Sequence, residues 1–194
     1  LTSDPVVSGY DWSYVGAFFR ANYGYQGKYL AEFSCRYDGS SKFPENSKWG
    51  FFPSASIGWR LSEEKFMEWS RNWLDNLKIR LSAGSMGNGN IDPYKYIDYM
   101  TIKTSTVVIG DALGSYTTAP GAIPLSLTWE TATTYDVGFD MDLFRNRLSI
   151  GFDWYRRYTT DMYTVGVSLA AVYGTAAPKG NNASLKTNGW ELSV

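Results

Sequence analysis

The stretch WGFFPSASIGWRLSEE (49–64) alternates between two kinds of side chain. Every second residue from Phe51 onward belongs to a largely apolar set: Phe51, Pro53, Ala55, Ile57, Trp59 and Leu61. The positions between them hold Phe52, Ser54, Ser56, Gly58 and Arg60. Because successive side chains of a β-strand point to opposite faces, the stretch predicts a strand that meets two different surroundings.

The same alternation recurs on both sides of this stretch. Further strands with apolar residues at alternate positions are expected over 15–23, 29–37, 77–84, 135–143, 148–155 and 188–194. Charged residues fall on the opposite, polar face of the expected strands: Arg20, Glu32, Arg36, Arg60, Arg80, Asp136, Asp140 and Asp153. The pattern predicts an all-β, antiparallel sheet with one apolar and one polar face.

The connections between the expected strands alternate in character. Short or compact ones cover 24–28, 62–76 and 144–147, and long polar ones cover 38–48, 86–126 and 159–186. Gly27 is the expected turn residue of the first, and Ser62 is the expected N-cap of a short helix in the second. Within the longest loop, 96–109 is a candidate hairpin. Short turns at one end and long loops at the other are typical of transmembrane β-barrels.

A soluble antiparallel sheet with one face packed on a core produces the same alternation. We therefore keep two interpretations of different classes. The favoured one is a segment of a transmembrane barrel, whose polar face lines a watery lumen and whose apolar face meets lipid. The alternative is a soluble β-sheet module, such as a carbohydrate-binding domain.

The composition of the 194 residues narrows the function classes. The net charge of −1 argues against nucleic acid as a partner. Histidine is absent, which removes histidine-based triads and the usual zinc sites, and one cysteine allows no internal disulfide. Aromatic residues make up 17% of the chain and charged residues only 19%, and no stretch reaches the roughly 20 apolar residues of a transmembrane helix. Many aromatic residues beside few charged ones fit the alternating strands of an outer-membrane β-barrel.

Four long runs resemble the SusC/RagA family of TonB-dependent outer-membrane transporters. They are YLAEFSCRYDGSSKF (29–43), WGFFPSASIGWRLSEE (49–64), WLDNLKIRLSAGSMGNGNI (73–91) and LTWETATTYDVGFDMDLFRNRLSIGFDWY (127–155). NGWELSV (188–194) fits the strand that usually follows. Two positions depart from the family pattern: Ala83 stands where an aromatic residue is common, and Met86 replaces the usual small residue before Gly87 and Asn88.

The resemblance implies a large plugged barrel of about 22 strands in the bacterial outer membrane. It implies import of glycans or peptides, driven by TonB, with a SusD-like lipoprotein as a lid. On this basis residues 1–194 are expected to be a fragment of the barrel domain that lacks the signal sequence, the TonB box and the plug. Six to eight strands do not close a barrel of that size, so the two outermost strands are expected to pair with strands outside this chain.

Enzyme and metal signatures are weak in this sequence. Ser62 to Lys65 matches S-x-x-K, but the companion motifs of penicillin-recognising enzymes are missing. Asp136, Asp140 and Asp142 are spaced evenly, which places them on one face of a strand rather than in a metal cluster. We expect no catalytic residue, no metal site and no cofactor.

Ligand contacts are expected in the long loops, where aromatic and amide side chains suit sugars. The candidate substrate-binding residues are Asn88, Asn90, Asp92, Tyr94 and Tyr96. The competing interpretation is that these residues only shape and solvate the loop. The same loop carries Tyr94, Tyr96, Tyr99 and Tyr116, and it is the expected docking site of the lid because aromatic residues are favoured at protein interfaces. The alternative is that these tyrosines pack within the loop or lie at the membrane surface.

Overall fold

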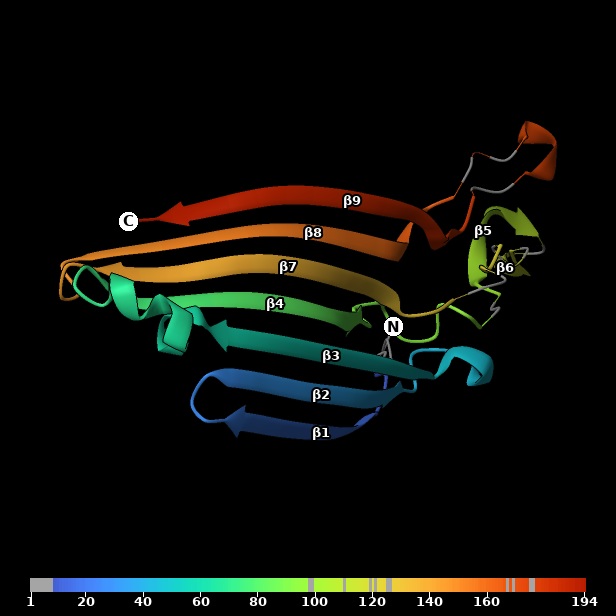
Figure 1. Ribbon diagram of the computed structural model, residues 1–194. Helices are drawn as coiled ribbons and strands as arrows, with labels where there is room; N and C mark the ends of the chain where they lie inside the picture. The colour runs from blue at the N-terminus through green and yellow to red at the C-terminus, as the bar shows by residue number, and fades with distance from the viewer. Residues whose placement is uncertain are drawn as a thin grey trace.

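The computed structural model describes residues 9–97, 100–109, 111–118, 120, 122–124, 127–166, 168, 170–174 and 177–194. Seven long strands form one antiparallel sheet in the order β1-β2-β3-β4-β7-β8-β9 (Figure 1). Their bounds are β1 Tyr14–Tyr25, β2 Tyr29–Ser40, β3 Trp49–Arg60, β4 Leu74–Asn88, β7 Glu130–Leu143, β8 Leu148–Val165 and β9 Lys179–Ser193. Neighbours in the sheet are neighbours in the chain, apart from the insertion between β4 and β7. The expected all-β, antiparallel fold is confirmed.

The inserted segment carries a separate two-stranded hairpin, β5 Ile102–Ile109 with β6 Ala112–Thr117. The hairpin lies within the expected loop, but it begins later than the candidate stretch 96–109, and its second strand lies beyond that stretch. Among the described residues, the two strands pair only with each other.

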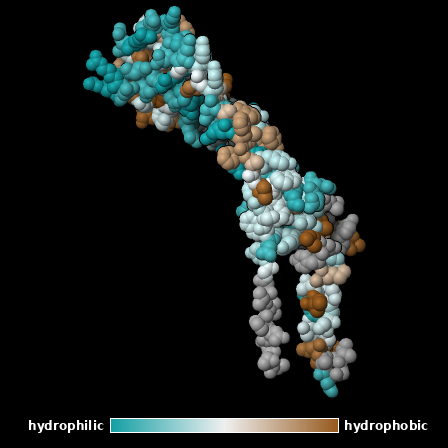
Figure 2. All heavy atoms as spheres, turned by 90° about the horizontal axis from the view of Figure 1, so that it is seen from below, coloured by the Kyte–Doolittle hydropathy of each residue, from teal (hydrophilic) through white to brown (hydrophobic). Residues whose placement is uncertain are grey.

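Short turns gather at one end of the sheet and long connections at the other (Figure 1). The β1–β2 turn contains Gln26 at φ 52° and Gly27 at φ 67°, the left-handed conformation that glycine adopts without strain. The β7–β8 turn covers 144–147 as expected. We call these two sides the turn end and the loop end. Seen from below, hydrophilic residues crowd the turn end, and a hydrophobic patch follows toward the middle of the strands (Figure 2).

The connection between β3 and β4 differs in detail from the expectation. It holds two 3-10 helices, η2 Leu61–Glu63 and η3 Lys65–Ser70. Ser62 lies inside η2 and caps nothing, so the predicted N-cap is wrong; its Oγ is buried and has no hydrogen-bond partner among the described residues. The segment is instead attached by Glu64. Its carboxylate accepts hydrogen bonds from Tyr29 Oη at 2.7 Å and Trp59 Nε1 at 3.2 Å.

The last two strands are longer than predicted. The stretch 159–186 was expected to be irregular, yet β8 continues to Val165 and β9 begins at Lys179. A register shift between Thr159 and Met162 breaks the alternation that the prediction relied on, and Asp161 there has φ 56°. Only 166–178 connects the two strands, and it includes the 3-10 helix η4 Ala171–Tyr173.

The described residues include no helix that is both long and apolar enough to cross a membrane. The remaining helical element is the short 3-10 helix η1 Glu45–Ser47 in the β2–β3 connection.

Candidate functional site

The pairing register separates the two faces as the alternation predicts. One row across all seven strands is mostly apolar: Tyr23, Ala31, Ile57, Leu81, Val137, Trp154 and Trp190. The adjacent row, on the other face, is mostly polar: Asn22, Glu32, Ser56, Ser82, Asp136, Tyr155 and Gly189. The apolar row is open to its surroundings, with Ile57 56% and Trp190 67% exposed. A sheet that exposes a continuous apolar face requires something else to cover it.

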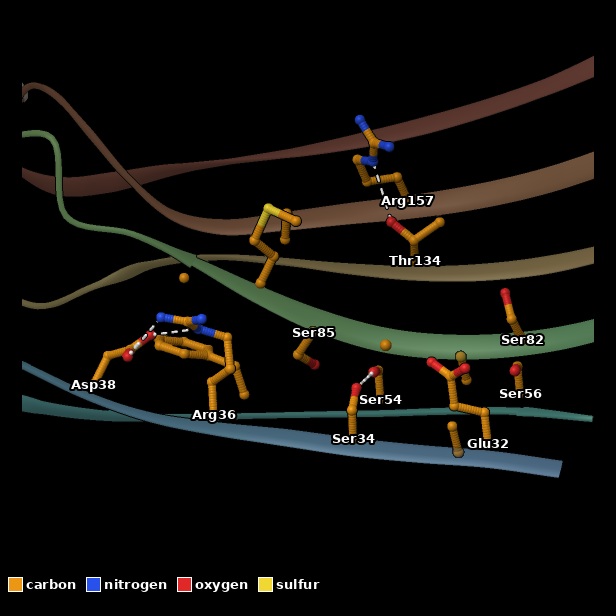
Figure 3. A pocket seen from close by; sticks show the side chains of 17 residues that line it. Glu32, Ser34, Arg36, Asp38, Ser54, Ser56, Ser82, Ser85, Thr134 and Arg157 are labelled. Carbon is orange, nitrogen blue, oxygen red and sulfur yellow. Dashed lines mark hydrogen bonds and ion pairs between the residues drawn. The ribbon is translucent and has the colours of Figure 1, made fainter. Parts of the chain in front are cut away.

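The polar face borders a hollow of about 530 Å³ that touches five neighbouring strands, from β2 to β8. Serines from β2 and β3 meet at its floor, where the Oγ atoms of Ser34 and Ser54 lie 2.7 Å apart (Figure 3). Toward the loop end, the Arg36 guanidinium donates two hydrogen bonds of 3.1 Å to Asp38. On the far side, Arg157 Nε donates to Thr134 Oγ1 at 3.1 Å. The hollow presents hydroxyl groups and both signs of charge.

Nearer the turn end, three strands share one ionic network on the polar face. Arg80 of β4 lies 2.8 Å from Asp140 of β7 and 3.0 Å from Asp153 of β8. Arg20 of β1 lies 2.9 Å from Glu32 of β2 on the same face. Alternating charges across neighbouring strands keep this wall hydrophilic with little net charge. It suits a water-filled space better than a packed core.

A compact apolar cluster closes the polar face at the loop end. It consists of Phe43, Phe52, Ile91, Leu127 and Trp129. The Trp129 ring lies 4.7 Å from the Phe43 ring and 5.6 Å from the Phe52 ring, and its Nε1 donates to Lys48 O at 3.3 Å. This explains why Phe52, an apolar residue, occupies a polar-face position in the stretch 49–64. Its ring belongs to the cluster that packs the starts of the long loops against the sheet.

The predicted ligand residues are distributed around this cluster. Asn88 ends β4, and its Oδ1 accepts a hydrogen bond of 3.0 Å from the Asn90 amide. Tyr94 Oη donates to Asp11 O at 2.8 Å, and Tyr96 Oη donates to Ser41 O at 3.4 Å while its ring packs against the cluster. These three contacts hold the loop in shape. A role for Asn88, Asn90, Asp92, Tyr94 and Tyr96 in binding substrate stays a prediction.

Asp92 lies in a different setting from the other four. It pairs with Lys95 at 3.4 Å and lines a small hollow of about 220 Å³ together with Tyr163 and Lys179. Tyr163 also packs against the apolar cluster, so this hollow lies beside the cluster at the loop end. Tyr163 and Lys179 were missed from sequence because the bulge in β8 hides the strand to which they belong.

Asn181 is a second residue that the sequence did not single out. It receives a hydrogen bond from the Thr128 amide at 3.0 Å and donates one of 2.9 Å to the Thr128 carbonyl. Its Nδ2 also donates to the Asp161 carbonyl at the bulge, at 2.5 Å. One side chain therefore fastens the entry to β7 onto β8 and β9, next to Leu127 and Trp129 of the cluster.

At the turn end, the environment of Glu64 stabilises its charged form. Hydrogen bonds from Tyr29 and Trp59, together with Lys28 Nζ at 3.4 Å, hold the pKa of the Glu64 carboxyl below its usual value. No group of three or more potential metal ligands occurs within the part of the chain that the structure describes.

Comparison with known proteins gives a consistent result. A protein-family model described as "TonB dependent receptor-like, beta-barrel" matches residues 2–194. The TonB-dependent receptor SusC of Bacteroides thetaiotaomicron is 36% identical over 184 residues, which is 93% of this chain and 18% of SusC. The TonB-dependent receptor P3 of Formosa agariphila is 36% identical over 182 residues, again 93% of this chain and 18% of the relative. The chain thus spans about a fifth of these relatives.

Solved structures show the same likeness. A structure of the RagAB peptide transporter has a TM-score of 0.79 and 31% identity, over 93% of this chain and 19% of the matched chain. The siderophore receptor PirA of Pseudomonas aeruginosa has a TM-score of 0.61 at 12% identity, over 93% of this chain and 30% of that one, which shows a shared fold alone.

Proposed function

The chain belongs to the TonB-dependent receptor-like β-barrel family, in its SusC/RagA-like branch, and from this premise we propose that it forms part of the wall and outer loops of an outer-membrane importer of glycans or peptides. The observation that carries the proposal is the two-faced sheet. An exposed apolar row and a charged polar row span the same seven strands, with long loops at one end only. A membrane barrel needs all three features.

In this proposal the apolar face contacts lipid and the polar face lines the lumen. Aromatic side chains of β2 and β3 stand at both borders of the apolar face, as they do at membrane interfaces. Tyr29 stacks on Trp59 at the turn end, with ring centroids 6.4 Å apart, and Tyr37 stacks on Trp49 at the loop end, at 5.0 Å. Eight residues separate the two tyrosines, about 26 Å along a strand. An apolar band of a barrel is about 25 Å tall.

Substrate would be held at the loop end. The small hollow beside Asp92, Lys95 and Tyr163 supplies a ring and hydrogen-bonding groups, which suit either a sugar or a peptide. The hollow on the polar face below it supplies serines and paired charges along which a polar substrate can move. The name of one solved relative includes peptide transport, but that name describes the relative, so glycan and peptide both remain within the proposal.

The full-length protein is proposed to act with a TonB protein through its plug and with a SusD-like lipoprotein over its loops. In this proposal TonB supplies energy through the plug, and the barrel wall formed by this chain provides a rigid, polar lumen. No catalytic step is assigned to this chain, since its relatives are transporters and receptors.

The test is uptake by cells that express the full-length protein. Labelled oligosaccharides and peptides should enter when TonB is present and should stay outside when TonB is deleted. The protein should also require detergent for extraction from the membrane fraction. A full-length protein that purifies from the cytosol in plain buffer would support the soluble carbohydrate-binding alternative.

A further inference from the structure

Two cations stand on the apolar face of the sheet, at its loop end. Three successive rows cross β7, β8 and β9 there. The first is apolar, with Val137, Trp154 and Trp190; the second has Tyr135, Arg156 and Asn188; the third has Thr133, Tyr158 and Lys186. The face thus changes from apolar to cationic within three rows, and none of these nine residues carries a carboxylate.

Arg156 is fixed in place by its neighbours on this face. Its guanidinium carbon lies 5.3 Å from the centre of the Trp154 ring, and its Nε donates a hydrogen bond of 2.8 Å to Asn188 Oδ1. Its two terminal amino groups donate to no other described residue. They therefore present a planar pair of donors, the geometry that matches two oxygens of a phosphate.

Lys186 repeats the arrangement one row further toward the loops. Its Nζ lies 5.5 Å from the centre of the Tyr158 ring. Neither Arg156 nor Lys186 forms an ion pair with any residue that the structure describes, whereas Arg20, Arg36 and Arg80 on the polar face all do. Arg60, Lys78 and Arg157 on the polar face form no ion pair with a described residue either, so Arg156 and Lys186 are distinguished by their position at the border of the apolar face.

The position of this border follows from the length of β8. Arg156 comes eight residues after Leu148, the first residue of the strand, or about 26 Å along it. From the start of β8 up to Arg156, this face of the strand carries only apolar residues: Leu148, Ile150, Phe152 and Trp154. If the sheet spans the outer membrane as proposed above, Arg156 and Lys186 lie where the hydrocarbon ends on the loop side.

We propose that Arg156 and Lys186 bind the phosphate of a membrane lipid headgroup on the loop side of the membrane. The inference rests on the proposed function, because it needs the apolar face to contact lipid. Two unpaired cations supply the charge that complements a phosphate, and the guanidinium of Arg156 binds it in bidentate fashion. Trp154 and Tyr158 hold both cations against the sheet and contact the carbon part of the lipid.

The test compares lipid binding by three full-length proteins in detergent: the wild type, the double variant Arg156→Gln/Lys186→Gln and the control Arg157→Gln. Arg157 adjoins Arg156 in the chain but lies on the polar face, where it donates to Thr134. The probes are a bisphosphorylated lipid A and the same lipid with both phosphates removed, with retention measured by native mass spectrometry. Removing two cations near a charged lipid surface should weaken binding of the phosphorylated probe roughly 10- to 30-fold.

The wild type and the control should retain the phosphorylated probe equally and prefer it over the dephosphorylated one. Equal retention of both probes by the wild type would overturn the inference, as would an Arg157→Gln defect as large as that of the double variant. Membrane assembly provides the separate readout. If all three proteins fail to reach the outer membrane, the proposed function is wrong. If they assemble and bind both probes alike, only the lipid site is wrong.

Discussion

Arg80 reaches across Gly138 to Asp153. The three residues share one row of the sheet, with Arg80 on β4, Gly138 on β7 and Asp153 on β8. The Arg80 Nη2 atom lies 3.0 Å from Asp153 Oδ1, although a whole strand separates the two residues. The contact is possible because position 138 has no side chain: a Cβ there would overlap the Asp153 carboxylate.

Gly138→Ala is therefore expected to destabilise the sheet by about 1–3 kcal/mol, the usual cost of forcing an atom into a packed contact. The Asp153 carboxylate has to move, and its ion pair with Arg80 is weakened. The measurement is the urea unfolding midpoint of the full-length protein in detergent. Gly58→Ala is the matched control, because Gly58 pairs with Arg80 from the other side. A Cβ there comes within 3.1 Å of the flexible end of Lys78 and makes an ordinary contact with Leu30 at 3.6 Å. An equal loss in both variants would contradict the explanation.

Phe139→Arg tests which face meets lipid. Phe139 lies four residues from the turn end of β7, near the middle of the apolar face, and its ring lies 5.8 Å from that of Phe152. In a membrane this change should cost roughly 2–4 kcal/mol. The neighbouring change Asp140→Asn on the polar face should cost less than about 1 kcal/mol, because Arg80 keeps Asp153 as a partner and the pair is partly solvated. Folding into lipid vesicles measures both, and similar costs would count against a lipid-facing apolar side.

Glu64 should make the β3–β4 connection sensitive to acid. Because its pKa is lowered in the folded protein, Glu64 contributes stability above the pKa it has when unfolded. That contribution is lost as the pH falls through the lower, folded value. Hydrogen exchange of residues 61–73 should therefore accelerate as the pH drops below about 4, after correction for intrinsic exchange.

Two variants make this prediction specific. Glu64→Gln should show fast exchange at neutral pH and little further change in acid, because the charged acceptor for Tyr29, Trp59 and Lys28 is gone. Glu63→Gln is the control, since Glu63 is exposed and has no hydrogen-bond partner among the described residues. If the control loses its acid response as well, Glu64 is not the responsible group.

The sequence predicts what alternation can encode and misses what depends on distant contacts. The strands, their faces and the alternation of turns and loops all follow from a period of two, which every strand repeats locally. The bulge at Asp161 interrupts that period, so the sequence pattern predicts a loop where the last part of β8 and the first half of β9 lie. Contacts of the loops are invisible to local patterns: Tyr94 bonds Asp11, 83 residues away, and Tyr96 bonds Ser41, 55 residues away. Tyr99 lies outside the described residues.

The last prediction concerns the lid, and the β5–β6 hairpin is the part of the long loop best placed to bind it. Tyr94 and Tyr96 are occupied in holding the loop, whereas the hairpin exposes a set of large apolar side chains: Ile102, Val107, Val108, Leu113 and Tyr116. Exposed apolar surface of this kind is typical of an interaction site. The hairpin also closes on itself, since Thr118 N donates to Thr101 O at 2.9 Å.

Deleting residues 101–118 from the full-length protein should therefore leave the barrel intact, because Thr101 and Thr118, the ends of the deleted segment, are hydrogen-bonded to each other and no strand of the large sheet loses a partner. Co-purification of the SusD-like lipoprotein and substrate uptake should both fall. A second variant tests the same apolar surface without shortening the loop: Ile102→Ser, Val107→Ser, Val108→Ser and Leu113→Ser combined. It should reduce lipoprotein binding to a similar extent. Undiminished lipoprotein binding in both proteins would exclude the hairpin as the docking site. Loss of barrel assembly in the deletion alone would show instead that the hairpin supports the fold.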